Sequence, residues 1–163
     1  MNSHQMIMKR IALFSFLLFF AKASFSARKS QYTADDLNCS IYRNGYFRYA
    51  GDYEQFVVLR EGDYQIEYNF KTKQWVTVKL SWPDGCDYSF VYVATNIKRL
   101  ESRIGYRLSV DILSGNANGY FYKALDEQSG KDVEGHIVFL KEKLSSTQNK
   151  KIRTKLAKTS AKR

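Results

Sequence analysis

The chain has 163 residues, with 26 Lys and Arg against 16 Asp and Glu, and therefore a formal net charge of +10. This length supports one domain and excludes large multidomain enzymes. Hydrophobic residues make up 44% of the chain and aromatic residues 15%, which excludes a fully disordered protein. We therefore expect one folded domain, for which the composition indicates no particular function.

The N-terminal segment has the pattern of an export signal. Lys9 and Arg10 precede an apolar run over residues 11–21, and a small-x-small motif lies at residues 21–23. The run has about half of the roughly 20 apolar residues that cross a bilayer. We predict a signal peptide over residues 1–23, which is cleaved to release a secreted or periplasmic protein. An uncleaved membrane anchor is the alternative.

Two cysteines, Cys39 and Cys86, remain after the predicted cleavage. An even number of cysteines in an exported chain favours a disulfide bond, and a bridge across so long a loop stabilises a fold by roughly 4 kcal/mol in the chain-entropy model. Two buried thiols are the alternative. We expect no metal site, because His136 is the only histidine beyond the predicted signal and no C-x-x-C motif occurs.

Four strands are predicted from strict alternation of apolar and polar residues. Period two places the apolar side chains of a strand on one face, which we expect to form the core. In chain order these apolar positions are Tyr64, Ile66, Tyr68 and Phe70, then Val76, Val78, Leu80 and Trp82, then Tyr88, Phe90, Tyr92 and Ala94, and finally Ile104, Tyr106, Leu108, Val110 and Ile112.

Weaker patterns at residues 45–50, 55–60, 119–125 and 133–140 complete a set of about eight strands. Short, turn-rich connections favour antiparallel neighbours and an up-and-down meander. Such a sheet closes into a lipocalin-like barrel or half-open barrel, or folds over as a two-layered sandwich. Because closure removes exposed strand edges, we predict an all-β, barrel-like domain over residues 24–143.

The positive charge belongs to the C-terminal tail. From Lys141 onward the chain holds nine basic residues and one acidic residue, whereas residues 24–140 hold 14 basic and 15 acidic residues. We expect residues 144–163 to be disordered, because lysine dominates them and aromatic residues are missing. A transient amphipathic helix is the alternative, since Ile152 and Leu156 lie four residues apart.

A basic tail can bind anionic surfaces such as lipid headgroups or polysaccharide. The candidate contacts are Lys150, Lys151, Arg153, Lys155 and Lys158. Specific nucleic-acid binding is not expected, because no aromatic residues interleave with these cations for base stacking. A merely solubilising tail is the alternative.

A string of residues through the domain resembles a known family. The string is Cys39-x5-Gly45-x-Phe47, then Gln65-x-Glu67, then Trp82-x3-Cys86-x-Tyr88. It is similar to that of small exported bacterial envelope proteins of unknown function, which are often automatically labelled DNA topoisomerase IV. The chain is far too short for the ATPase, acidic metal cluster and breakage domain of a topoisomerase, and it lacks the lipid-anchor cysteine of many family members.

Few residues offer catalytic chemistry. His136 is predicted to face outward, and neither a G-x-S-x-G motif nor a glycine-rich phosphate loop occurs. Carboxylate pairs such as Asp84/Asp87 and Glu127/Asp132 leave a hydrolase as an alternative. We assign no catalytic residue, no metal and no cofactor.

The predicted core face is rich in tyrosine. The candidate ligand-lining residues are Tyr64, Tyr68, Tyr88, Tyr92 and Tyr106. A buried tyrosine hydroxyl needs a partner, which another tyrosine, a main-chain carbonyl, water or a ligand can supply. Gln65 and Glu67 alternate with this face and are predicted to point outward, where Lys79 on the next strand would pair with them.

We therefore predict an exported, non-enzymatic binding or interaction module of the cell envelope. Its partner is expected to be a small amphipathic ligand or an envelope protein, with a further contact to an anionic surface through the tail. The alternatives are a carboxylate-dependent hydrolase that acts on envelope material and a structural envelope protein held by its basic tail.

Overall fold

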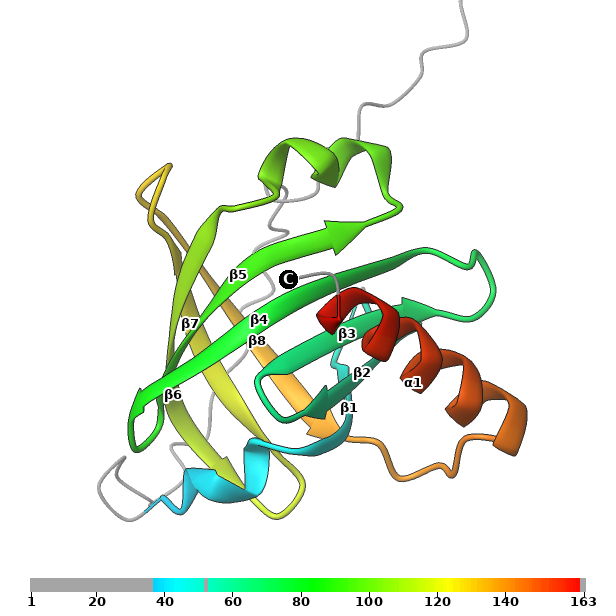
Figure 1. Ribbon diagram of the computed structural model, residues 1–163. Helices are drawn as coiled ribbons and strands as arrows, with labels where there is room; N and C mark the ends of the chain where they lie inside the picture. Colours follow the sequence, from blue (N-terminus) through cyan, green and yellow to red (C-terminus); the bar gives the residue numbers. More distant parts are fainter. Residues whose placement is uncertain (1–36, 52, 162–163) are drawn as a thin grey trace, which may run out of the picture.

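The computed structural model describes residues 37–51 and 53–161, and shows the predicted all-β fold (Figure 1). Eight antiparallel strands follow one another around a closed barrel, and the last pairs with the first. The strands are β1 (Gly45–Tyr49), β2 (Phe56–Glu61), β3 (Tyr64–Asn69), β4 (Trp75–Asp84), β5 (Asp87–Thr95), β6 (Arg107–Asn116), β7 (Gly119–Asp126) and β8 (Lys131–Phe139). The predicted signal peptide over residues 1–23 lies outside the described residues.

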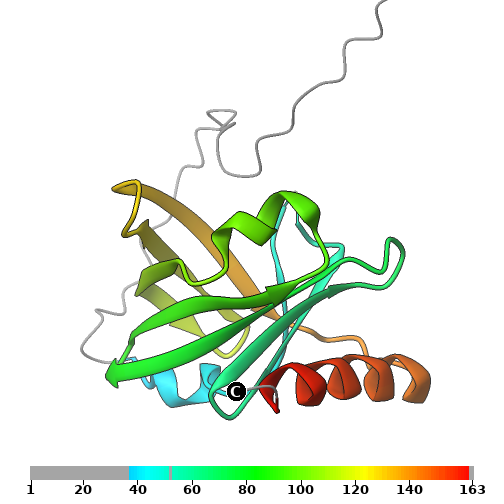
Figure 2. The ribbon, with the colours of Figure 1, turned by 45° about the horizontal axis from the view of Figure 1, so that its top comes forward.

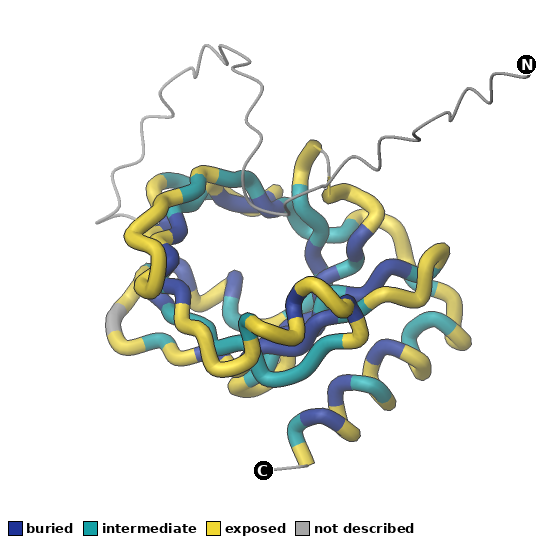
Figure 3. Tube along the Cα trace, turned by 90° about the horizontal axis from the view of Figure 1, so that it is seen from above, coloured by how far each residue is buried: buried dark blue, intermediate teal, exposed yellow. Residues whose placement is uncertain are grey.

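Three helices accompany the strands in the described part of the chain. The 3₁₀ helix η2 (Cys39–Tyr42) lies at one end of the barrel, and the 3₁₀ helix η3 (Lys98–Arg103) connects β5 to β6 at the other (Figure 2). The α-helix α1 (Ser146–Ser160) lies outside the ring of strands (Figure 3). No described helix is long and apolar enough to cross a membrane.

The predicted disulfide between Cys39 and Cys86 is present, with a Cα–Cα distance of 5.1 Å and 47 residues between the two positions. It ties η2 to the hairpin between β4 and β5. Tyr42, at the end of η2, is fully buried and its hydroxyl donates to the Asn116 carbonyl at 2.9 Å. Gly115 leaves space for this hydroxyl, because a Cβ there would overlap it. The helix therefore plugs one end of the barrel.

The orientation predicted for β3 is wrong. Ile66 and Tyr68 pack outside the barrel against α1, whereas Gln65 and Glu67 point into the interior. The expected pairing with Lys79 is also wrong, because this lysine lies opposite Tyr64 on the outer face. Alternation along the strand holds, but it cannot tell which side is the interior when both sides are covered.

Residues 146–160 of the tail form a helix, where disorder was expected. A capping box begins α1: Ser145 Oγ accepts from the Gln148 backbone N–H at 3.2 Å, and Gln148 Oε1 accepts from the Ser145 N–H at 3.0 Å. Ile152 and Leu156 are buried against the outer apolar side chains of β2 and β3. This partner surface stabilises the helix, because a short isolated helix is marginal in water.

Candidate functional site in the barrel interior

Alternation along the strands sends a set of polar side chains into the barrel interior. The set comprises Tyr49 of β1, Arg60 of β2, Gln65 and Glu67 of β3, Tyr88 and Tyr92 of β5, and Tyr120 and Tyr122 of β7. The surrounding inward positions are mainly apolar. Because a buried polar group costs free energy unless it is hydrogen-bonded, the partners of each member decide what the interior can bind.

Arg60 retains only 1% of its surface exposed and lies in the half of the interior next to η2. Its Nε donates to Gln65 Oε1 at 2.7 Å, and its Nη1 donates to the Tyr42 carbonyl at 2.9 Å. Its Nη2 donates to the hydroxyls of Tyr120 at 2.6 Å and Tyr88 at 3.0 Å. These bonds occupy four of the five guanidinium N–H groups, so Arg60 holds the fold together and is not open to a ligand.

Aromatic rings enclose the same guanidinium. Its Cζ lies 4.9 to 5.7 Å from four ring centroids, those of Phe47, Trp82, Tyr88 and Tyr120. Such contacts stabilise a buried cation without a counter-charge beside it. These side chains fill the half of the interior next to η2.

Glu67 is a carboxylate inside the barrel. Its Oε1 accepts from the Tyr49 hydroxyl at 2.6 Å and from Gln65 Nε2 at 2.9 Å. Because Gln65 also accepts from Arg60, one side-chain amide links the two opposite charges. Burial raises the pKa of Glu67, while the two hydrogen bonds and the charge of Arg60 oppose this rise. Its Oε2 has no hydrogen-bond partner among the described residues.

Two tyrosine hydroxyls lie in the same part of the interior. Neither Tyr92 nor Tyr122 has a hydrogen-bond partner for its hydroxyl in the described part of the chain; their rings contact Phe90 and Tyr120. Burial raises the pKa of both hydroxyls, and the charge of Glu67 adds to both rises. The strand register brings Tyr92 to the same level of the barrel, because Tyr92 lies opposite Val78 and Val78 lies opposite Gln65 on the strand of Glu67.

Several inward-facing residues of the barrel are only partly buried. Tyr49, Glu67, Phe90, Tyr92 and Tyr122 point inward, yet each is only partly buried. These inward-facing side chains therefore keep part of their surface accessible. We name Tyr49, Glu67, Tyr92 and Tyr122 the interior site.

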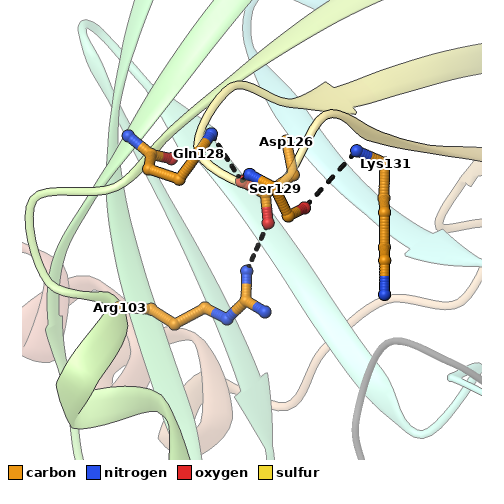
Figure 4. A network of polar contacts seen from close by, with 5 residues as sticks. All are labelled: Arg103, Asp126, Gln128, Ser129 and Lys131. Carbon is orange, nitrogen blue, oxygen red and sulfur yellow. Dashed lines mark hydrogen bonds and ion pairs between the residues drawn. The ribbon is translucent and has the colours of Figure 1, made fainter.

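An ion pair stands at the end of the barrel next to η3. Arg103 of η3 donates to Asp126 Oδ2 at 2.7 Å (Figure 4). Asp126 Oδ1 also accepts from the backbone N–H groups of Gln128 and Ser129. Burial opposes the charge of Asp126, but these donors hold its pKa below the ordinary value. The contacts fasten η3 to the turn between β7 and β8.

The predicted ligand-lining tyrosines are divided between three places. Tyr88 and Tyr92 lie inside the barrel, as expected. Tyr64 and Tyr68 instead pack under α1, because β3 turns its apolar face outward. Tyr106 is 36% exposed before β6, with the Arg103 guanidinium 5.8 Å from its ring centroid. Two of the five candidates therefore lie inside the barrel, and one of them, Tyr92, belongs to the interior site.

Sequence reasoning missed most of the polar interior. Tyr120 and Tyr122 carry a visible signal, because they alternate along a strand that the pattern predicts. Gly135 is a second signal, since a Cβ there would overlap the ring of Tyr122 on the neighbouring strand. Nothing in the sequence indicates that Arg60 is an interior residue, because a charged residue at a strand end is normally exposed to solvent.

Three of the five cations proposed to bind an anionic surface instead contact side chains of the barrel. Lys155 Nζ lies 4.5 Å from the ring centroid of Trp75, and Lys151 Nζ lies 5.5 Å from that of Tyr68. Arg153 pairs with Glu61. These three cations therefore help to dock α1. The remaining two candidates, Lys150 and Lys158, are exposed.

Other potential sites carry less chemistry. His136 stacks on Phe121 at 4.0 Å on the outside of the barrel, and burial lowers its pKa. Within the described ranges, no group of three or more His, Cys, Asp and Glu side chains could hold a metal ion.

Comparison of the chain with protein-family models, with curated proteins and with solved structures gave no match. A functional proposal therefore rests on the geometry of the interior site.

Proposed function

We propose that the protein is a non-enzymatic binding module that holds a small amphipathic ligand inside its barrel. The observation that carries this proposal is the group of unpaired polar atoms beside Glu67: one carboxylate oxygen and the hydroxyls of Tyr92 and Tyr122. None of the three is fully buried, so each is accessible to a hydrogen-bonding partner. A ligand that enters the barrel supplies partners to all three groups.

The walls around this polar group favour a ligand with an apolar body. Phe90 is partly buried and faces inward, and Val76, Val78 and Leu108 belong to the same apolar core. Ligand pockets commonly combine apolar walls with a few polar groups that fix the orientation. The ligand would therefore place its polar end at Glu67 and its apolar part along these walls.

Binding is favoured over hydrolysis by the state of the inward carboxylates. Paired-carboxylate hydrolysis needs one acid and one base free to act across a cleft. Asp126, the second carboxylate near the interior site, is held by Arg103 and by two backbone N–H groups. It is therefore occupied in the fold and poorly placed to exchange a proton with a substrate.

We place this module outside the cytoplasm, in the periplasm or the extracellular space. The disulfide Cys39–Cys86 supports this location, because such bonds persist in oxidising compartments. The predicted signal peptide over residues 1–23 supports it independently.

Native mass spectrometry of the protein purified from its own host tests the proposal. We expect a bound species of defined mass, which is lost or strongly reduced in the double variant Tyr92→Phe/Tyr122→Phe. Tyr106→Phe is the matched control, because it removes a hydroxyl from an exposed ring. A protein without any bound species, or equal occupancy in both variants, would contradict the proposal.

A further inference from the structure

The hydrogen-bonding groups of the interior site are not balanced between donors and acceptors. The Tyr49 hydroxyl and the Gln65 amide already donate to Glu67, and four Arg60 N–H groups are in use. When Glu67 is ionised, its Oε2 is a pure acceptor, while the hydroxyls of Tyr92 and Tyr122 can donate or accept. A ligand that satisfies the carboxylate must therefore offer it a donor.

Formal charges, in contrast, are already balanced inside the barrel. Arg60 and Glu67 are joined through Gln65, and Arg103 and Asp126 form an ion pair at the barrel end. A carboxylate ligand would place its charge against Glu67, and an ammonium ligand would leave one unbalanced positive charge. Either charge would lack a partner of opposite sign inside the barrel, which is costly.

From these two observations we propose that the interior site selects an uncharged ligand with a hydroxyl or N–H donor at its inner end. This inference rests on the proposed binding function and names the chemical class of its ligand. The strongly positive chain would suggest an anionic ligand, but the cations of α1 lie outside the barrel, whereas the unpaired acceptor lies within it.

A series of eight-carbon compounds tests the selection directly. The probes are 1-octanol, octylammonium and octanoate, which share an apolar chain and differ in the end group. Their affinities are measured at pH 7.5 by displacement of the fluorescent neutral amine N-phenyl-1-naphthylamine, and by calorimetry. We expect 1-octanol to bind at least tenfold more tightly than either ion.

Two variants connect the ranking to the carboxylate. Glu67→Gln keeps the size of the side chain and removes its charge, so 1-octanol should bind several-fold more weakly and the penalty on octanoate should fall. Glu101→Gln, on the exposed surface of η3, is the matched control and should change neither affinity. Thermal melting of both variants checks that the barrel remains folded.

The outcomes separate this inference from the proposed function. Tightest binding of octylammonium or octanoate, unchanged affinities for 1-octanol and octanoate in Glu67→Gln, or a co-purifying ligand that is an ion would overturn the selection while ligand binding stands. A ligand-free native mass spectrum, together with no binding of any of the three compounds, would overturn the proposed function itself. A co-purifying neutral donor supports both.

Discussion

At the scale of single residues, the barrel depends on a charge that lies inside it. Arg60 connects three tyrosines and Gln65, and thereby joins η2, β3, β5 and β7. The favourable terms are hydrogen bonds and ring contacts, which offset the cost of removing the guanidinium from water. Loss of this residue should therefore affect the whole barrel and leave Glu67 as an uncompensated charge.

We expect Arg60→Ala to lower the free energy of unfolding by roughly 3–5 kcal/mol, the usual cost of breaking a buried charge network. Arg107→Ala is the control, because that arginine is exposed and its side chain donates to Ser89; its effect should stay below about 1 kcal/mol. Urea denaturation measures both values. Equal effects would show that Arg60 is dispensable.

The raised pKa of Glu67 makes a prediction with a definite sign. The folded-state pKa of Glu67 lies above its unfolded-state pKa. At pH values between these two pKa values, the folded protein therefore binds more protons than the unfolded protein. The contribution of Glu67 to stability consequently falls as the pH rises through this interval. Glu67→Gln removes this contribution. The stability of the wild type relative to this variant should therefore decrease from pH 4 upward.

Urea denaturation of both proteins across pH 4 to 8 measures this difference. Glu101→Gln is again the control, and its difference from the wild type should not show the same fall. A relative stability that increases with pH would mean that the pKa of Glu67 is lowered, not raised.

At the scale of elements, α1 and β3 show where pattern reasoning reaches its limit. The alternation in β3 is real, and so is the four-residue spacing of Ile152 and Leu156. Neither pattern reveals that the apolar face of β3 and the apolar face of α1 cover each other on the outside of the barrel. Once they do, the polar face of β3 becomes the inner face, and Glu67 enters the interior. The orientation of one strand thus depends on a helix about 80 residues away in the chain.

Removal of the buried contact should detach this helix. We expect Leu156→Ala to lower the free energy of unfolding by roughly 2–5 kcal/mol, the usual range for a buried leucine. Thr154→Ala, on the exposed side of α1, should have little effect. Hydrogen exchange over residues 146–160 should be faster in Leu156→Ala only. Fast exchange in the wild type would mean that the tail is disordered.

At the scale of the whole molecule, the sequence was sufficient for the architecture but not for the site. Period-two patterns predicted eight strands, and the need to close a sheet predicted the barrel that the structure shows. The pairing of Cys39 with Cys86 followed from the number of cysteines. Arg60 and Glu67 could not be predicted as interior residues, because charged side chains usually face water and only the closed tertiary structure supplies their partners.

The disulfide carries a prediction for the molecule as a whole. Reduction, or the double variant Cys39→Ser/Cys86→Ser, should lower the free energy of unfolding by about 4 kcal/mol in the chain-entropy model. It also frees η2, whose Tyr42 carbonyl accepts from Arg60. Urea denaturation with and without reductant measures the effect. A loss near zero would show that the other contacts of η2 are sufficient.

The central claim is that a ligand with a donor group binds beside Glu67. The most direct measurement is a crystal structure of the protein purified from its own host and kept at neutral pH. The account predicts non-protein density inside the barrel, within hydrogen-bond distance of Glu67 Oε2 and of the Tyr92 or Tyr122 hydroxyl. An interior filled by side chains alone, or by ordered water alone, would contradict it.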